Sequence, residues 1–181
     1  YYGSSITQGG CASRPGITYQ AYISRRFDCD YINLGFSGSC KAEYEMCEYI
    51  ACLPMSLLVL DYDHNAPSVE HLEKTHYAFY ETVRRKNPDL PIIMMSAPIS
   101  TLDEYNPIIP MMKKRRMIIM ESYIRAVRSG DENVYFVDGE TLFAGDLRDS
   151  CTVDGTHPND LGFASMAKAL GDLLETILLQ I

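Results

Sequence analysis

Short apolar segments alternate with longer amphipathic stretches along this chain. The apolar segments are rich in aliphatic and β-branched residues without strict polar alternation, which is typical of strands buried on both faces of a parallel sheet. They lie at residues 31–34, 57–60, 92–95 and 134–137. The stretches around them predict helices near residues 18–27, 41–52, 69–86, 111–129 and 160–179.

The order of these elements predicts the fold class. Strands that alternate with helices favour an α/β fold, because each helix covers a face of a parallel sheet. Tyr1 and Tyr2 resemble the end of one more strand. We therefore expect a three-layer α/β/α sandwich, built on a flavodoxin-like, doubly wound parallel sheet of about five strands.

Local signals mark several element boundaries. Ser68 is expected to cap the helix near residues 69–86, and Asn87 with Pro88 to end it, because the residue before proline avoids the helical conformation. Gly130 is expected to end the next helix. The proline-rich residues 106–110 predict a long loop at the sheet edge where ligands bind in such folds.

The chain length fits one well-packed core. At 181 residues, with no evident linker, repeat or low-complexity tract, we expect residues 1–181 to form a single domain. The chain starts at Tyr1 rather than methionine and carries no visible signal peptide. We expect an excised domain that lacks the start of its first strand or an N-terminal region, and the compartment stays open.

Charge and hydropathy exclude two classes of partner. The net charge of −8 and the isoelectric point near 4.9 argue against nucleic acid, because phosphate binding depends on clustered Lys and Arg. No apolar run approaches the roughly 18 residues of a membrane span, so we expect a soluble globular protein. The one basic run, residues 113–116, predicts a solvated helix face.

The six cysteines do not predict a metal site. They are too sparse for a disulfide scaffold and form no C-x-x-C pair. Cys47 and Cys52 have no second pair beside them, so we expect buried thiols rather than zinc ligands. We expect neither a metal nor a cofactor, and the redox state of the thiols stays open.

Two motifs at opposite ends of the chain could form one active site. Gly3-Ser4-Ser5 offers a serine in a glycine-rich turn, and Asp154 precedes His157 by three residues. A serine hydroxyl attacks a carbonyl usefully when a histidine accepts its proton and an acid fixes the tautomer of that histidine. We expect the fold to bring Ser5 to His157 with Asp154 behind it.

Two further polar clusters follow predicted strands. Residues 35–38 follow the strand at 31–34, and residues 61–65 follow the strand at 57–60. Because parallel strands release the chain at one edge of the sheet, we expect both clusters to lie near Ser5 and His157.

These blocks resemble the motifs of the SGNH or GDSL hydrolases, specifically a bacterial esterase branch, over nearly the whole chain. The resemblance implies that Ser5 is the nucleophile and that His157 and Asp154 complete its triad. It also implies an oxyanion hole made by the N–H groups of Ser5 and Gly38 and the amide of Asn65.

The chain departs from the family pattern in two blocks. Serine stands at position 4, where the family usually has aspartate. The third block usually reads Gly-x-Asn-Asp, whereas this chain has Asp63-His64-Asn65-Ala66. The first change removes a carboxylate that supports the turn, and the second keeps the amide of Asn65.

The expected function is a metal-independent serine esterase that acts on a small-molecule or carbohydrate ester. The resemblance suggests release of a small acyl group such as acetyl from carbohydrates or small alcohols. A thioesterase or lysophospholipase of the same superfamily is the closest alternative. A flavodoxin-like phosphate binder is disfavoured because the first turn lacks both P-loop and dinucleotide spacing, and a catalytically silent carbohydrate-binding relative stays open. The oligomeric state is also open.

Four side chains have weaker assignments. His64 adjoins Asn65 and could line the substrate pocket or bond a backbone carbonyl. Arg14 could bind a polar substrate or a loop carbonyl. His71 and His76 lie five residues apart on a predicted helix, so they share no face and are expected at the surface.

Overall fold

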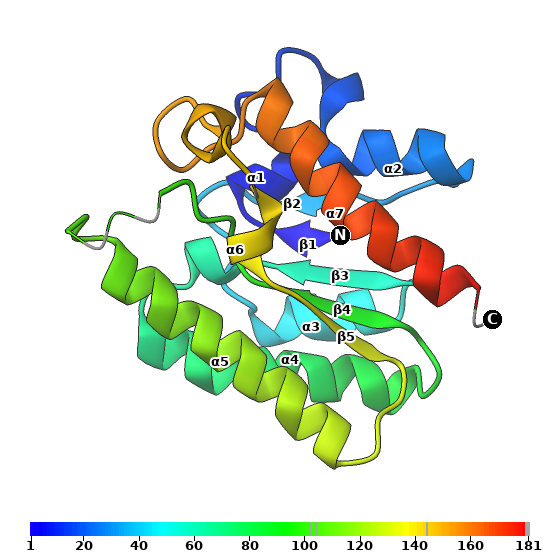
Figure 1. Ribbon diagram of the computed structural model, residues 1–181. Helices are drawn as coiled ribbons and strands as arrows, with labels where there is room; N and C mark the ends of the chain where they lie inside the picture. Colours follow the sequence, from blue (N-terminus) through cyan, green and yellow to red (C-terminus); the bar gives the residue numbers. More distant parts are fainter. Residues whose placement is uncertain (102, 104, 144, 180–181) are drawn as a thin grey trace.

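Five parallel strands form the centre of the computed structural model, which describes residues 1–101, 103, 105–143 and 145–179. Their order is β2-β1-β3-β4-β5 (Figure 1), the order of flavodoxin-like sheets, so the predicted fold class is confirmed. The strands are β1 (Tyr2–Gly3), β2 (Leu34–Gly35), β3 (Leu58–Asp61), β4 (Ile92–Met95) and β5 (Val134–Val137).

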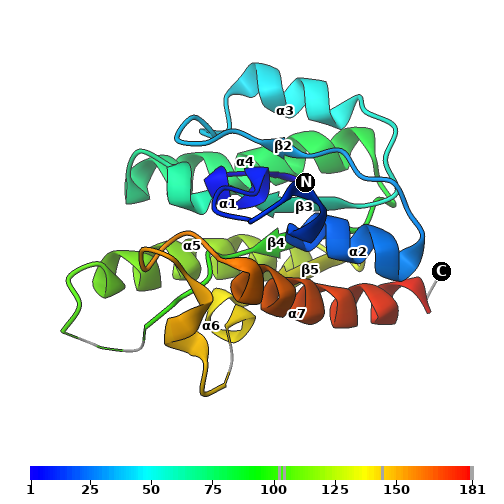
Figure 2. The same cartoon turned by 90° about the horizontal axis from the view of Figure 1, so that it is seen from above.

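Helices cover both faces of the sheet. One layer contains α2 (Tyr19–Phe27) and α7 (Asp160–Leu178), which lie side by side in Figure 2, together with the short α6 (Gly139–Leu142). The opposite layer contains α3 (Tyr44–Ala51), α4 (Val69–Lys86) and α5 (Ile109–Arg128). The short helix α1 (Ser5–Gln8) directly follows β1. Of the helices that the described residues form, not one has the length and apolar character that a bilayer crossing demands.

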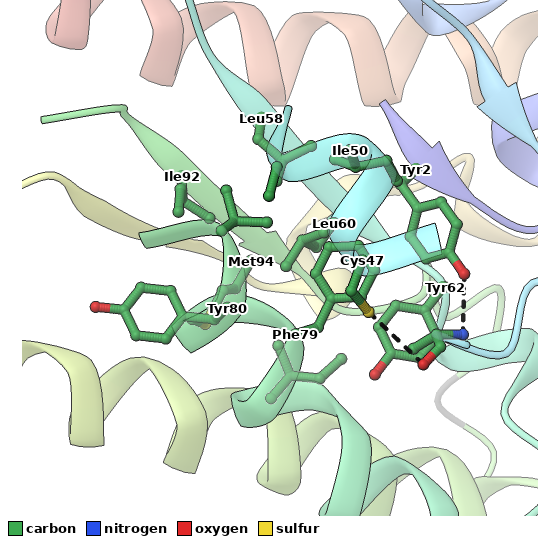
Figure 3. Packing of buried hydrophobic residues seen from close by; sticks show 14 of the residues in the cluster. Tyr2, Cys47, Ile50, Leu58, Leu60, Tyr62, Phe79, Tyr80, Ile92 and Met94 are labelled. Atoms are coloured by element: carbon green, nitrogen blue, oxygen red, sulfur yellow. Dashed lines mark hydrogen bonds between the residues drawn. The ribbon is translucent and has the colours of Figure 1, made fainter. Parts of the chain in front are cut away.

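Alternate side chains of each strand enter different cores. On β4, Ile92 and Met94 pack toward α3, α4 and α5, whereas Ile93 and Met95 pack toward α2 and α7. Figure 3 shows the first of these cores, where Phe79 of α4 packs near Met94. Because both faces are covered, the strand reads as a continuous apolar run, and each such side chain contributes about 1.5–3 kcal/mol on burial.

The helix-end signals of α4 and α5 are confirmed. The Ser68 hydroxyl accepts a hydrogen bond from the His71 N–H at 3.1 Å, and α4 ends before Asn87. Gly130 has a φ of 92°, in the left-handed region, directly after the last residues of α5.

Three boundaries differ from the prediction by two or more residues. Pro110 belongs to the first turn of α5 instead of a loop, because a first-turn residue does not need its N–H for a helical bond. The strand predicted at residues 31–34 is only Leu34–Gly35, since β1 offers it two pairing residues. The helix predicted from residue 41 begins at Tyr44.

The prediction that His76 lies at the surface is wrong. His76 is 1% exposed and stacks on Tyr62, with ring centroids 5.7 Å apart. It shares the buried face of α4 with Leu72, Phe79 and Val83, at helical spacings of three and four residues. Burial lowers the pKa of His76 to about 4. His71 is half-buried, and its ring bonds the Lys41 carbonyl at 2.7 Å.

The prediction that residues 113–116 form a solvated helix face is correct for the two lysines and wrong for the two arginines. Lys113 and Lys114 are exposed, but Arg115 is buried and Arg116 is half-buried. Arg116 Nε donates to Asp138 at 2.6 Å, because α5 turns this side chain toward the residue that precedes α6.

The expectation of two buried thiols at Cys47 and Cys52 holds for Cys47 alone. Cys47 lies on the inner face of α3, whereas Cys52 follows the end of the helix and is exposed. The thiol of Cys52 lies 3.3 Å from the Lys86 ammonium.

Candidate active site

Ser5 occupies the first position of α1, directly after the turn that follows β1. The preceding residue, Ser4, caps α1 because its hydroxyl accepts a hydrogen bond from the Ile6 N–H at 3.2 Å. At Gly3 a Cβ atom would lie 2.3 Å from the Asp61 carbonyl oxygen, so only glycine lets the strand pass this close to β3. The turn therefore fixes where the Ser5 hydroxyl lies.

The structure brings Ser5, His157 and Asp154 together. Ser5 Oγ lies 2.9 Å from His157 Nε2, although 152 residues separate the two in sequence. His157 Nδ1 lies 2.6 Å from Asp154 Oδ2. Both distances are within hydrogen-bond range, so the hydroxyl, the imidazole and the carboxylate form one continuous chain.

A closed turn before α7 holds Asp154 and His157. Asp154 Oδ1 accepts hydrogen bonds from the N–H groups of Thr156 at 2.9 Å and His157 at 2.7 Å. Thr152 and Pro158 pair as an antiparallel bridge at the ends of this turn. The hydrogen bonds from the His157 backbone and ring lower the pKa of Asp154 to about 2. The carboxylate is therefore ionised and accepts the Nδ1 proton, which leaves Nε2 free to accept from Ser5.

A buried network of hydrogen bonds connects α1 to the neighbouring elements through Thr7. Thr7 Oγ1 donates to Asp61 Oδ2 at 2.9 Å, and the Tyr19 hydroxyl donates to the same oxygen at 3.2 Å. The Thr7 carbonyl accepts from the amides of Gln20 and Asn33, both at 2.8 Å. Sequence reasoning missed these residues because nothing local distinguishes a polar residue that supports a turn from one that meets solvent.

Gly38 lies in the loop after β2, and two hydrogen bonds donated by backbone N–H groups attach this loop to the Ser5 region. The Phe36 N–H donates to the Gly3 carbonyl at 2.8 Å, and the Ser37 N–H donates to Gln8 Oε1 at 3.0 Å. Gly38 has a φ of 69°, which disfavours other residues, while a Cβ there would meet no atom within 4 Å. The Gly38 backbone therefore has a left-handed conformation, and the space beside its Cα is open.

Asn65 ends the 3-10 turn Asp63–Asn65 that follows β3. Its side-chain Oδ1 accepts from the Cys40 N–H at 3.4 Å, which joins the Asn65 turn to the Gly38 loop. Because the oxygen of the amide faces Cys40, the Nδ2 donor is left for another partner. The ends of β1, β2 and β3 thus bring Ser5, Gly38 and Asn65 to one edge of the sheet.

His64 and Asp154 line a cavity of about 380 Å³. The rest of its lining comes from the residues after β4, the start of α5 and the turn before α7, and it includes Asn106 and Ile108 of the predicted rim loop. Burial lowers the pKa of His64, which favours the neutral form of its imidazole. The cavity therefore lies beside the hydrogen-bonded side chains of Ser5, His157 and Asp154, next to the Asp154 carboxylate.

Arg14 is not brought into this cavity. Its side chain is exposed, and its carbonyl accepts from the Ile17 N–H at 3.2 Å. The neighbouring Ser13 instead ties this loop to α7, because its N–H and hydroxyl donate to Asp160 at 2.9 and 2.8 Å.

Sequence reasoning also missed Arg115, which donates from α5 to the turn that carries Asn65. A run of four basic residues gives no sign of which one is buried. Among the described residues, no group of three or more His, Cys, Asp or Glu side chains is arranged to hold a metal ion.

Known proteins resemble this chain in sequence and in fold. Residues 1–175 match the sequence model of the GDSL-like Lipase/Acylhydrolase family. A structure from Bacteroides ovatus, named as a GDSL-like lipase, has 36% identity and a TM-score of 0.88; the match covers 98% of this chain and 52% of the other. No match was found among curated proteins.

Two more distant structures share the fold. The salicylyl-acyltransferase SsfX3 from a tetracycline biosynthetic pathway has 21% identity and a TM-score of 0.82, over 97% of this chain and 53% of that protein. A family two carbohydrate esterase from Clostridium thermocellum, in complex with cellohexaose, has 18% identity and a TM-score of 0.75, over 99% of this chain and 64% of that protein. This chain therefore spans between about half and two thirds of the length of these three proteins.

Proposed function

The chain belongs to the GDSL-like lipase/acylhydrolase family, and on this premise we propose that it is a metal-independent serine esterase that hydrolyses carboxylic esters. The observation that carries this proposal is the chain of hydrogen bonds from Ser5 Oγ through the His157 ring to Asp154, at 2.9 and 2.6 Å.

The proposed reaction begins at Ser5. His157 Nε2 takes the hydroxyl proton as Ser5 Oγ attacks the ester carbonyl carbon, and the Asp154 carboxylate stabilises the imidazolium that forms. His157 then protonates the leaving alcohol oxygen, and an acyl group stays on Ser5. Water, activated by the same imidazole, attacks the acyl carbon, and return of the proton to Ser5 completes the cycle.

Negative charge on the tetrahedral oxygen needs donors. We assign this task to the N–H groups of Ser5 and Gly38 and to Asn65 Nδ2, at the ends of three adjacent strands. Removal of one such donor typically raises the barrier by about 3–4 kcal/mol. Asn65 suits the task because its Oδ1 is engaged by Cys40 at 3.4 Å and its Nδ2 is left as a donor.

The proposed substrate carries a small acyl group, such as acetyl, on a carbohydrate or a small alcohol. The cavity of about 380 Å³ beside Asp154 is at the small end of the range for ligand sites, which favours a compact group. The likeness to a carbohydrate esterase supports a sugar ester as one form of the substrate.

Hydrolysis of p-nitrophenyl acetate tests the proposed chemistry. We expect Ser5→Ala and His157→Ala each to lower kcat by several orders of magnitude, because the members of a triad act as a unit. Ser129→Ala and His71→Ala, both outside the site, are the matched controls. Wild-type turnover by Ser5→Ala would refute the assignment of the nucleophile.

A panel of esters tests the acyl group separately. With acetyl, butanoyl and octanoyl esters of one alcohol, kcat/KM should be highest for acetyl. A preference for octanoyl that Ser5→Ala abolishes would keep the serine mechanism and favour a thioesterase or lysophospholipase instead.

A further inference from the structure

Arg115 is a buried cation whose hydrogen bonds go to backbone carbonyls. It is 5% exposed on the inner face of α5, within an otherwise solvated basic run. Its Nη1 atom donates to the carbonyl of Asp63, and Nη2 donates to the carbonyl of Ala66 at 2.8 Å. These two carbonyls lie on either side of His64 and Asn65. One guanidinium therefore spans the turn that carries Asn65.

The turn has few internal bonds of its own. The Asn65 N–H donates to Tyr62 at 2.9 Å, and the Ala66 N–H reaches the Asp63 carbonyl at 3.3 Å. A single 3-10 turn of this kind has poorer hydrogen-bond geometry than an α-helix, so outside contacts decide its shape. On its other side the Asp63 carboxyl accepts from the Ala97 N–H at 3.0 Å. The turn is thus held between the end of β4 and α5.

Simple packing does not account for an arginine at this position. Removing a guanidinium from water costs several kcal/mol, and an apolar side chain of similar volume would pack there without that cost. What the guanidinium adds is a rigid pair of donors whose spacing fixes two carbonyls relative to each other. The carbonyls it fixes belong to the turn that presents the Asn65 amide.

Arg115 does not line the cavity beside Asp154, although Ile109 and Met112 of the same helix do. An effect of Arg115 on a bound ester would therefore pass through the turn. The Asn65 amide meets the Gly38 loop through one bond, from the Cys40 N–H at 3.4 Å, and this long bond alone constrains the amide weakly.

We propose that Arg115 is a positioning residue for the oxyanion hole: it fixes the turn at residues 63–66 so that Asn65 Nδ2 meets the tetrahedral oxygen. This inference rests on the proposed esterase function. A donor that acts in the transition state raises kcat, whereas an equal effect on ground-state binding would change KM. Loss of Arg115 should therefore lower kcat and leave KM nearly unchanged.

The first test is steady-state kinetics on p-nitrophenyl acetate. Arg115→Met keeps an unbranched side chain of similar volume and removes the donors. We expect kcat to fall about 10- to 100-fold, with KM changed less than about 2-fold. Arg115→Lys should recover part of the loss. Arg116→Met, which breaks the neighbouring pair with Asp138, is the matched control and should keep kcat within about 2-fold.

The second test is a double-mutant cycle with Asn65→Ala. If Arg115 acts through the amide, Arg115→Met should lower kcat by less than about 2-fold once Asn65 is alanine. An equal loss in both backgrounds would overturn the proposal, as would unchanged kcat in Arg115→Met. Should Arg115→Met fail to fold by circular dichroism, the Arg115→Lys cycle decides in the same way. Failure of the esterase proposal would be separate, because it would show as wild-type turnover in Ser5→Ala.

Discussion

The side chain of Asp154 is partly exposed to solvent, yet its hydrogen bonds fix its protonation state. About half of its side chain is open to solvent, at 48% exposure, yet its two oxygens accept bonds from the His157 ring and from two backbone N–H groups. Those donors, chiefly on His157, are why its pKa falls to about 2. The carboxylate thus keeps its charge throughout the pH range in which an esterase would be assayed.

We predict that Asp154→Asn lowers kcat on p-nitrophenyl acetate by about 10³- to 10⁴-fold. The amide can turn its NH₂ toward His157 Nδ1, which places the ring proton on Nε2, where it can no longer accept the Ser5 proton. Steady-state kinetics measures the loss, and circular dichroism checks the fold. Asp172→Asn on the outer face of α7 is the control, and equal activity of the two variants would contradict the role of Asp154.

At the scale of elements, α4 shows how local and tertiary signals combine. Its bounds, Val69–Lys86, follow from the Ser68 cap and the proline after Asn87, and both act within the helix itself. Its buried face was harder to predict, because His76 is a polar residue within an apolar series. Spacing identified the helix, whereas packing against Tyr62 decided the burial of His76.

We predict that Ser68→Ala lowers the free energy of unfolding by about 1 kcal/mol, because the His71 N–H loses its acceptor. Chemical denaturation monitored by circular dichroism measures the change. Ser68→Asp is the matched variant, since a carboxylate also accepts this bond and should keep stability near that of the wild type. Equal midpoints for Ser68→Ala and the wild type would show that the cap contributes nothing.

At the scale of the whole molecule, the neutral state of buried His76 contributes to the pH dependence of stability. Its pKa is about 4 in the folded protein because burial disfavours the cation, whereas a free imidazole has a pKa of about 6.5. The unfolded chain therefore binds a proton as pH falls below about 6.5, while the folded chain does not. The stability that depends on neutral His76 is fully present above about pH 6.5. It is lost as the pH falls toward about 4, the pKa of His76 in the folded protein.

We predict that His76→Phe, which keeps an aromatic ring beside Tyr62, reduces this pH dependence. Between pH 7 and pH 5, the drop in the free energy of unfolding should be about 2 kcal/mol smaller in the variant than in the wild type. Urea denaturation at both pH values measures the difference. His71→Phe, at a half-buried position of the same helix, is the control. The same drop in His76→Phe and the wild type would show that another group controls acid stability.

The sequence by itself determined the elements and the chemistry that acts over short distances. Strands β4 and β5 were predicted at their observed bounds, because burial on both faces leaves an uninterrupted apolar run. The turn from Asp154 to His157 was also predictable, since three residues are enough to bring a carboxylate to an imidazole.

Tertiary structure alone decided what depends on contacts between distant segments. The 2.9 Å approach of Ser5 to His157 requires β1 and the turn before α7 to meet at one edge of the sheet. Within the basic run of α5, two lysines are exposed while Arg115 is buried beneath them. A residue type fixes which bonds a side chain can make, but only the packing of other elements around it determines whether water or a carbonyl is the partner.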